Sequence, residues 1–230
     1  MTTDNAWTGA NFRHGGWLEH ERRYERATQF VEAAKALWGS WAPDAVAEGP
    51  GADSWARPGS IATVTRETDL VRLRATATLP ASRQGRPVLF QAGDSTGGRE
   101  PAAQHADVVF SANSEYHEAV AYAADLCSRL ARYGRSADAP RILPGASVVL
   151  GDTPSQIADG WTHYVRTLAV DGFNITPHLV PSSLADIVDK LVPELQERGV
   201  YRTEYEGSTL REHLGLPAAR SRPDPGSNPG

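Results

Sequence analysis

The sequence has little cysteine, little net charge and no long apolar run, and each shortage excludes a class of protein. Cys127 is the single cysteine among 230 residues, which excludes an internal disulfide and a thiolate metal cluster and favours a reducing cytoplasm. Lys and Arg number 23 against 28 Asp and Glu, so the net charge of −5 gives no basic surface for nucleic acid or an anionic membrane. No stretch approaches the roughly 18 consecutive apolar residues of a membrane span.

Signals for secretion, metal binding and hydrolase chemistry are lacking as well. Residues 1–17 are polar and carry no apolar segment of a signal peptide, so we expect a soluble cytoplasmic protein. The 7 histidines form no H-x-x-x-H or H-E-x-x-H pair, and we expect no metal. No G-x-S-x-G elbow is present, and no catalytic residue can be assigned from these patterns. Cys127 falls on the apolar side of a predicted helix, where we expect a core residue.

The first third of the chain is predicted to hold one long helix and one half-exposed strand. Residues 18–41 place apolar side chains at i, i+3 and i+4, the spacing of an amphipathic helix. Residues 42–60, rich in proline and glycine, indicate a loop, and we treat 42–80 as an excursion. Residues 71–79 alternate strictly between apolar and polar side chains, which predicts a strand with one wet face outside any buried parallel sheet.

From residue 86 onward the pattern alternates between short apolar runs and amphipathic helices. The runs are apolar on both sides, as in a parallel sheet covered by helices. Four such units make half of a (β/α)₈ barrel or a small doubly wound sheet. The predicted strands are 86–93, 106–111, 145–151 and 168–175, and the predicted helices are 96–105, 114–132, 153–167 and 182–198. Residues 217–230 have the composition of a disordered tail.

The segment QAGDSTGGR at 91–99 is the sharpest local signal for a ligand site. A buried strand ends there, glycines free the backbone, and Asp94, Ser95 and Thr96 can cap the following helix. Hydroxyls and backbone N–H groups at a helix start form an anion site, and such loops hold phosphates in barrels. The alternative is an ordinary capped turn, because capped strand-to-helix loops are common.

His20 and Tyr24 lie four residues apart near the start of the first predicted helix, so both side chains occupy one face. Two hydrogen-bonding tips one turn apart suit a polar ligand such as a phosphate or a ribityl chain. On the pattern alone, a surface histidine and a tyrosine at the edge of the core are favoured.

Several motifs together resemble the bacterial-luciferase-like, flavin-dependent monooxygenases. They are NFR followed by HERRY within 11–24, GRPVLFQAG at 85–93, DGFNI at 171–175, and VPELQERGVYRTEYEGSTLREHLGL at 192–216. The resemblance runs from about residue 3 to 217 and is strongest to the branch that includes nitrilotriacetate and dibenzothiophene-sulfone monooxygenases. It implies an α/β fold, a TIM-type (β/α)₈ barrel of parallel strands with outer helices.

The family's opening strands have no counterpart in this sequence. The resemblance therefore implies a partial barrel, about the C-terminal half, formed by residues 1–216. We expect weak or no activity from such a chain alone, because the flavin-binding groups of the opening strands are missing with them. We also expect a homo-oligomer, or pairing with a missing half.

The chemistry implied by the resemblance is oxygen insertion into a small organic substrate through a flavin hydroperoxide. Reduced FMN (FMNH₂) is the cofactor and O₂ the co-substrate, with FMNH₂ supplied by a separate NAD(P)H:flavin reductase. In the family, a His and a Tyr one turn apart and a serine in the QAG loop contact FMN. These match His20, Tyr24 and Ser95, and the neighbouring backbone of Thr96 and Gly97 completes the expected phosphate site. The family often has a second small hydroxyl residue where this chain has Asp94, whose carboxylate would repel a phosphate if it pointed into the site.

Two other functions are compatible with the sequence. One is a non-catalytic half-barrel remnant or interaction module that pairs with another half-barrel or with itself. The other is an oxidoreductase of the same superfamily that uses the deazaflavin F420. The matches at 11–24 and 192–216 favour the FMN branch.

Overall fold

The computed structural model describes residues 18–46, 55–92, 94–136, 139–148, 150 and 154–219. The NFR motif at 11–13 and most of the predicted tail lie outside these residues. The chain divides into two compact units, Met1–Pro87 with Thr209–Gly230, and Val88–Ser208. One barrel domain over 1–216 stays a prediction.

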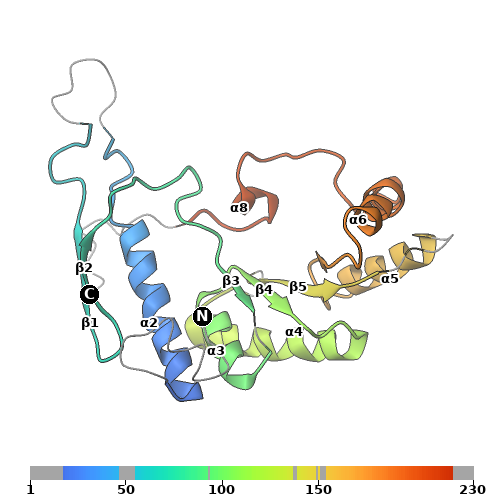
Figure 1. Cartoon of the computed structure of the whole chain (residues 1–230), viewed down its shortest axis with the longest axis horizontal. Coiled ribbons are helices and arrows are strands. Elements are labelled where there is room, and N and C mark those ends of the chain that lie inside the picture. Colours follow the sequence, from blue (N-terminus) through green and yellow to red (C-terminus); the bar gives the residue numbers. More distant parts are fainter. Residues whose placement is uncertain are drawn as a thin grey trace. The chain divides into compact units, whose positions relative to one another are not determined.

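The first unit contains a long helix and an antiparallel strand pair (Figure 1). Helix α2 (His20–Trp38) confirms the predicted helix, and Gly39 follows its last residue. Strands β1 (Thr63–Glu67) and β2 (Arg72–Thr76) pair antiparallel in a two-stranded sheet, so the alternating segment lies outside the parallel sheet, as predicted. Strand β1 escaped prediction because Val64 is its single buried residue and no apolar alternation marks it. A short helix, α8 (Leu210–His213), belongs to this unit and begins with a capping box formed by Thr209 and Glu212.

The second unit is a four-stranded parallel sheet in the order β3-β4-β5-β6 (Figure 1). Its strands are β3 (Phe90–Ala92), β4 (Val108–Ser111), β5 (Arg141–Ala146) and β6 (Asn174–Ile175). A helix follows each of the first three strands: α3 (Thr96–His105), α4 (Tyr116–Leu130) and α5 (Pro154–Arg166). The parallel pairing of all four strands confirms the repeated strand–helix pattern. The fourth strand was predicted at 168–175 but is limited to Asn174–Ile175. Among the described residues the sheet is open at β3 and β6, so it forms part of a barrel rather than a closed one.

The last helical segment contains a wide turn with a local cause. It runs through α6 (Ser182–Asp186), the π-helical η2 (Ile187–Leu191) and α7 (Val192–Glu197). Pro193 has no N–H, and in a regular α-helix its ring would clash with the carbonyl four residues earlier. The π-helical residues immediately before it widen the backbone at that point. Gly199, with a φ of +66°, lies just beyond the end of the helix in the left-handed conformation that favours glycine.

The prediction of the third strand at 145–151 was wrong by about four residues. Strand β5 begins at Arg141, where its register with β4 pairs Val108 with Arg141. Ile142, Pro144 and Ala146 are buried on one side of the strand, so a proline inside the segment did not exclude it from the sheet. The apolar residues Val148 and Leu150 come after the strand has ended.

The largest of three buried clusters in the described part of the second unit lies between the sheet and helices α3 and α4. It is formed by Ala102, Ala103, Ala106, Val109, Tyr122, Leu126, Leu130 and Ile142. The buried face of α4 carries Ala119, Tyr122, Leu126 and Leu130. Cys127 is exposed, which corrects its predicted core position. It follows Leu126 by about 100° around the helix axis and so leaves the buried face.

Candidate functional site

Strand β3 ends at Ala92, and the turn after it places a capped helix start at the carboxyl edge of the sheet. Ser95 is the N-cap of α3, and its Oγ accepts a hydrogen bond from the Gly98 N–H at 3.1 Å. The Ser95 carbonyl accepts from the N–H groups of Gly98 and Arg99. Because the first four N–H groups of a helix have no partner within it, the amides of Thr96 and Gly97 remain as donors among the described residues.

This donor set fits an anion. Ser95, Thr96 and Gly97 are all exposed, so a ligand can reach them. The positive end of the helix dipole adds to the two amides. A flavin phosphate has the charge and the acceptor oxygens that such a turn binds, and the residues present therefore fit the phosphate of FMN.

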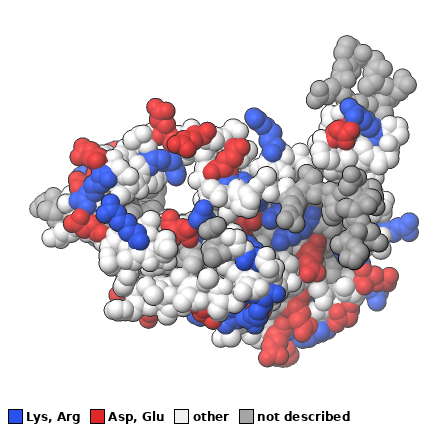
Figure 2. Space-filling view, turned by 180° about the vertical axis from the view of Figure 1, so that it is seen from behind, with Lys and Arg blue, Asp and Glu red and all other residues white. Residues whose placement is uncertain are grey.

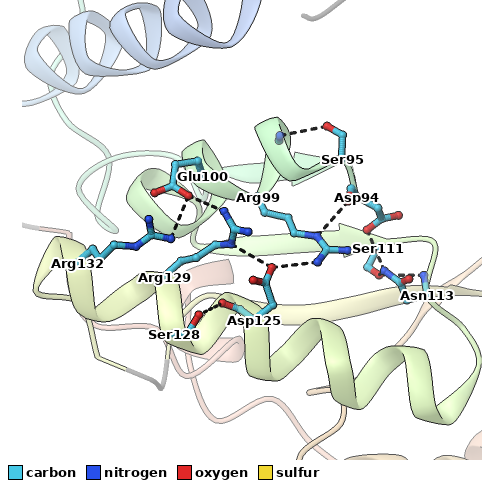
Figure 3. Close-up of polar contacts among 11 residues, drawn as sticks. Asp94, Ser95, Arg99, Glu100, Ser111, Asn113, Asp125, Ser128, Arg129 and Arg132 are labelled. Atoms are coloured by element: carbon cyan, nitrogen blue, oxygen red, sulfur yellow. Dashed lines mark hydrogen bonds and ion pairs between the residues drawn. The ribbon is translucent and has the colours of Figure 1, made fainter. Parts of the chain in front are cut away.

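Asp94 does not point its carboxylate at this turn. Its Oδ2 accepts a hydrogen bond from the backbone N–H of Ala112 at 2.7 Å, and its Oδ1 accepts from Asn113 Nδ2 at 3.2 Å (Figure 3). Both donors belong to the loop between β4 and α4. The buried Ser111 Oγ in turn accepts from the N–H of Asn113 at 3.0 Å and from its Nδ2 at 2.9 Å. The two loops are thereby joined through side chains.

A chain of ion pairs ties α3 to α4 beside these loops (Figure 3). Arg99 Nε donates to the Asp94 carbonyl at 3.0 Å, and its Nη1 donates to Asp125 at 2.9 Å. Arg129 contacts both Asp125 and Glu100. The pKa of Asp125 is lowered, chiefly by the hydrogen bond from Arg129, while partial burial acts in the opposite direction. These ion pairs hold α3 and α4 together. Each of the four side chains, Arg99, Glu100, Asp125 and Arg129, is engaged in them, so we assign none of them a catalytic role.

Tyr122, on the buried face of α4, packs against Arg99 and is unsuited to proton transfer. It is 1% exposed, and its hydroxyl has no hydrogen-bond partner among the described residues. The Arg99 guanidinium lies 4.8 Å from the ring centroid. Burial, followed by the charge of Asp94, raises the pKa of Tyr122 to about 12, so the phenol stays neutral at physiological pH.

His20 and Tyr24 share one face of α2 in the first unit. Their rings meet edge to face with centroids 5.0 Å apart, as the four-residue spacing predicts. The side chain of Arg23 donates to His20 Nδ1 at 3.1 Å. His20 is exposed and Tyr24 is half-buried.

Sequence reasoning missed polar residues that follow the other strands. Ser111 and Asn113 lie at the end of β4, and Ser147 lies directly after β5. Ser147 Oγ donates to the Thr176 carbonyl at 2.9 Å and lies 3.2 Å from His178 Nε2, after β6. The sequence signal that could have identified them is their position just after the predicted strands, because barrel enzymes place their sites at the carboxyl ends of parallel strands.

On the face in Figure 2, acidic and basic side chains are interspersed. Within the described ranges, no cluster of three or more His, Cys, Asp or Glu side chains is arranged to hold a metal ion. None of the described helices has the length and apolar character needed to cross a membrane.

The family assignment rests on a match over nearly the whole sequence. The sequence profile of the luciferase-like monooxygenases matches residues 3–220. The chain belongs to this family.

Individual relatives agree with the assignment. The chain is 29% identical to nitrilotriacetate monooxygenase component A of Aminobacter aminovorans, with 94% of the chain and 67% of the relative covered. It is 28% identical to the dibenzothiophene-sulfone monooxygenase of Rhodococcus erythropolis, covering 94% and 68%. The crystal structure of a long-chain alkane monooxygenase superposes with a TM-score of 0.85 at 25% identity, covering 90% of this chain and 63% of that one.

The chain thus spans about two thirds of the length of these relatives, and it also lacks residues inside the matched region. The alignment with the nitrilotriacetate enzyme covers 305 positions, whereas 94% of 230 residues is about 216. The difference, 305 − 216, means that about 89 positions of the relative have no counterpart in this chain.

Proposed function

We propose that this chain is the FMN-phosphate-binding part of an FMN-dependent monooxygenase acting on a small organic substrate. The observation that carries the proposal is the Ser95 turn, an exposed anion-binding helix start at the carboxyl end of β3, in a chain of the luciferase-like family. The relatives named above are monooxygenases, which favours FMN over F420. One similar structure, a riboflavin lyase, is described as holding a modified FMN.

In this proposal, Ser95 and the amides of Thr96 and Gly97 bind the phosphate. His20 and Tyr24, which belong to the first unit, keep the role in FMN binding that the family resemblance implies for them. Bound FMNH₂ supplies the two electrons with which O₂ is activated. A separate NAD(P)H:flavin reductase supplies FMNH₂, in keeping with a relative named as component A. We place the protein in the cytoplasm, where NAD(P)H is available to that reductase.

A second candidate is a non-catalytic half-barrel that pairs with another chain. The open edges of the sheet at β3 and β6, together with the missing 89 or so positions, favour it. Barrel enzymes gather catalytic groups from several strands around the ring, and oxygen transfer needs a site closed to water.

One experiment separates these two candidates. The purified 230-residue chain is supplied with FMNH₂ from a reductase, and FMN binding, oxygenated product and oligomeric state are measured; binding of FMN without product supports the first candidate. We expect no product from the chain alone, because its ring is incomplete. Product formation that depends on Ser95 would establish the monooxygenase in the chain as it stands. If neither product nor binding of FMN is found, and the chain self-associates, the result supports the interaction module.

A further inference from the structure

Asp94 occupies the position between strand β3 and the Ser95 turn, where its charge should oppose a phosphate. The residue is nevertheless half-buried, and both carboxylate oxygens accept hydrogen bonds from the next strand's loop. The shorter bond, 2.7 Å to the backbone of Ala112, has the length of a strong charge-assisted contact. The carboxylate thus points toward the β4–α4 loop and not toward the Ser95 turn.

The partner of Asp94 is itself fixed. Ser111, which is 1% exposed, holds both the backbone N–H and the side-chain amide of Asn113. The Asn113 amide therefore donates to two oxygens, Ser111 Oγ and Asp94 Oδ1 (Figure 3). Because Ser111 is the last residue of β4, the β3–α3 turn is anchored to the rigid end of the neighbouring strand.

The other side of Asp94 is anchored too. Arg99, one turn into α3, donates from Nε to the Asp94 carbonyl and from Nη1 to Asp125 of α4. Asp94 therefore receives hydrogen bonds on its carbonyl and on both carboxylate oxygens. Ser95 is the very next residue, so its position depends on these bonds.

We propose that Asp94 is a positioning residue, a carboxylate clamp between the β3–α3 and β4–α4 loops that holds the Ser95 turn ready for the flavin phosphate. This inference rests on the proposed function. The clamp keeps the negative charge away from the Ser95 turn, because the carboxylate oxygens are occupied by Ala112 and Asn113. Its effect on phosphate binding runs through the position of Ser95 and not through contact with the ligand.

The test compares three versions of the full chain: wild type, Asp94→Asn and Asp94→Ala. Asparagine keeps one acceptor for the Ala112 N–H and is neutral, whereas alanine removes both acceptors. Asp189→Ala is the matched control, because it removes an exposed carboxylate from η2 of the same unit. Each protein is titrated with FMN and with riboflavin, which lacks the phosphate, and the hydrogen-exchange rate of the Ala112 amide is measured without ligand.

We expect Asp94→Ala to weaken FMN binding about tenfold, the scale of one lost hydrogen bond to a charged group. Riboflavin binding should be unchanged, and the Ala112 amide should exchange faster. Asp94→Asn should restore both the FMN affinity and slow exchange, and Asp189→Ala should match wild type. Tighter FMN binding by both Asp94 variants would overturn the proposal, because it would show that the charge only repels phosphate. Equal losses for FMN and riboflavin in Asp94→Ala would also overturn it, since they would indicate general damage to the fold.

The proposed function can fail separately. A wild-type chain that binds FMN no better than riboflavin would contradict the phosphate site. The exchange rate of Ala112 would still decide the clamp, and an unchanged rate in Asp94→Ala would overturn it.

Discussion

Ser95 can cap helix α3 and, in the proposed function, also bind the phosphate. Its Oγ accepts from Gly98, which caps α3, and a hydroxyl that accepts one bond can donate another to a ligand. The sequence predicted the extent of α3 correctly and left Asp94, Ser95 and Thr96 as candidates for its cap, of which Ser95 is the N-cap. The role of the turn in binding FMN stays a prediction.

Replacing Ser95 with alanine should weaken FMN binding by about 1–2 kcal/mol, the value of a hydrogen bond to a charged acceptor. The measurement is a flavin titration followed by fluorescence. Thr209→Ala is the matched control, because it removes the side-chain cap of α8 in the other unit. That control should lose stability without losing FMN affinity. Unchanged FMN affinity in Ser95→Ala would remove Ser95 from the site.

The orientation of Asp94 could not be predicted from the sequence. Its partners lie 18 and 19 residues away, and they meet it only because β3 and β4 are neighbours with a particular register. The contact of Ser147 with His178, 31 residues apart, is hidden for the same reason. Long-range polar contacts leave no periodic trace in a sequence.

At the scale of elements, periodicity predicted the helices of the second unit and the parallel order of its strands. Helix α4 shows why: its buried residues recur every three or four positions, as one face of a helix requires. The error on β5 arose because strand pairing with β4, rather than apolarity, sets where that strand begins. Cys127 was misplaced because it borders the buried face without belonging to it.

Two adjacent residues of α4 test this assignment of faces. Leu126→Ala should lower the free energy of unfolding by about 2–5 kcal/mol, because it opens a cavity at a side chain that is 1% exposed. Cys127→Ala should change that free energy by less than about 0.5 kcal/mol, as expected for an exposed position. Denaturant unfolding of both variants gives the comparison. Equal losses in the two variants would contradict the helix register.

The ion pairs between α3 and α4 should make stability depend on acidity. The folded-state pKa of Asp125 lies below its ordinary value, mainly through the hydrogen bond from Arg129. A carboxyl of this kind contributes stability that is present above its unfolded pKa and is lost as pH falls through the folded pKa. The unfolding temperature of wild type should therefore drop as the pH falls below about 4, the ordinary pKa range of an aspartate, and that of Asp125→Asn should drop less. Asp189→Asn should behave like wild type. An identical acid dependence in wild type and Asp125→Asn would show that this carboxyl contributes nothing.

At the scale of the whole molecule, family membership was evident from motifs spread along the chain, and the profile match over residues 3–220 establishes it. The missing positions inside the matched region could not be predicted, because only comparison with a longer relative reveals them. The open edge of the sheet leaves Phe90 of β3 57% exposed among the described residues. An exposed aromatic on an unpaired edge strand is a ready contact for another chain.

The central claim, that this chain recognises the phosphate of a flavin at the Ser95 turn, is tested most directly by titrating the wild-type chain with FMN and with riboflavin under the same conditions. We expect saturable but weak binding in which FMN is preferred about tenfold, or about 1.4 kcal/mol, because only FMN offers the phosphate. Equal affinities, or no binding of either flavin, would contradict it.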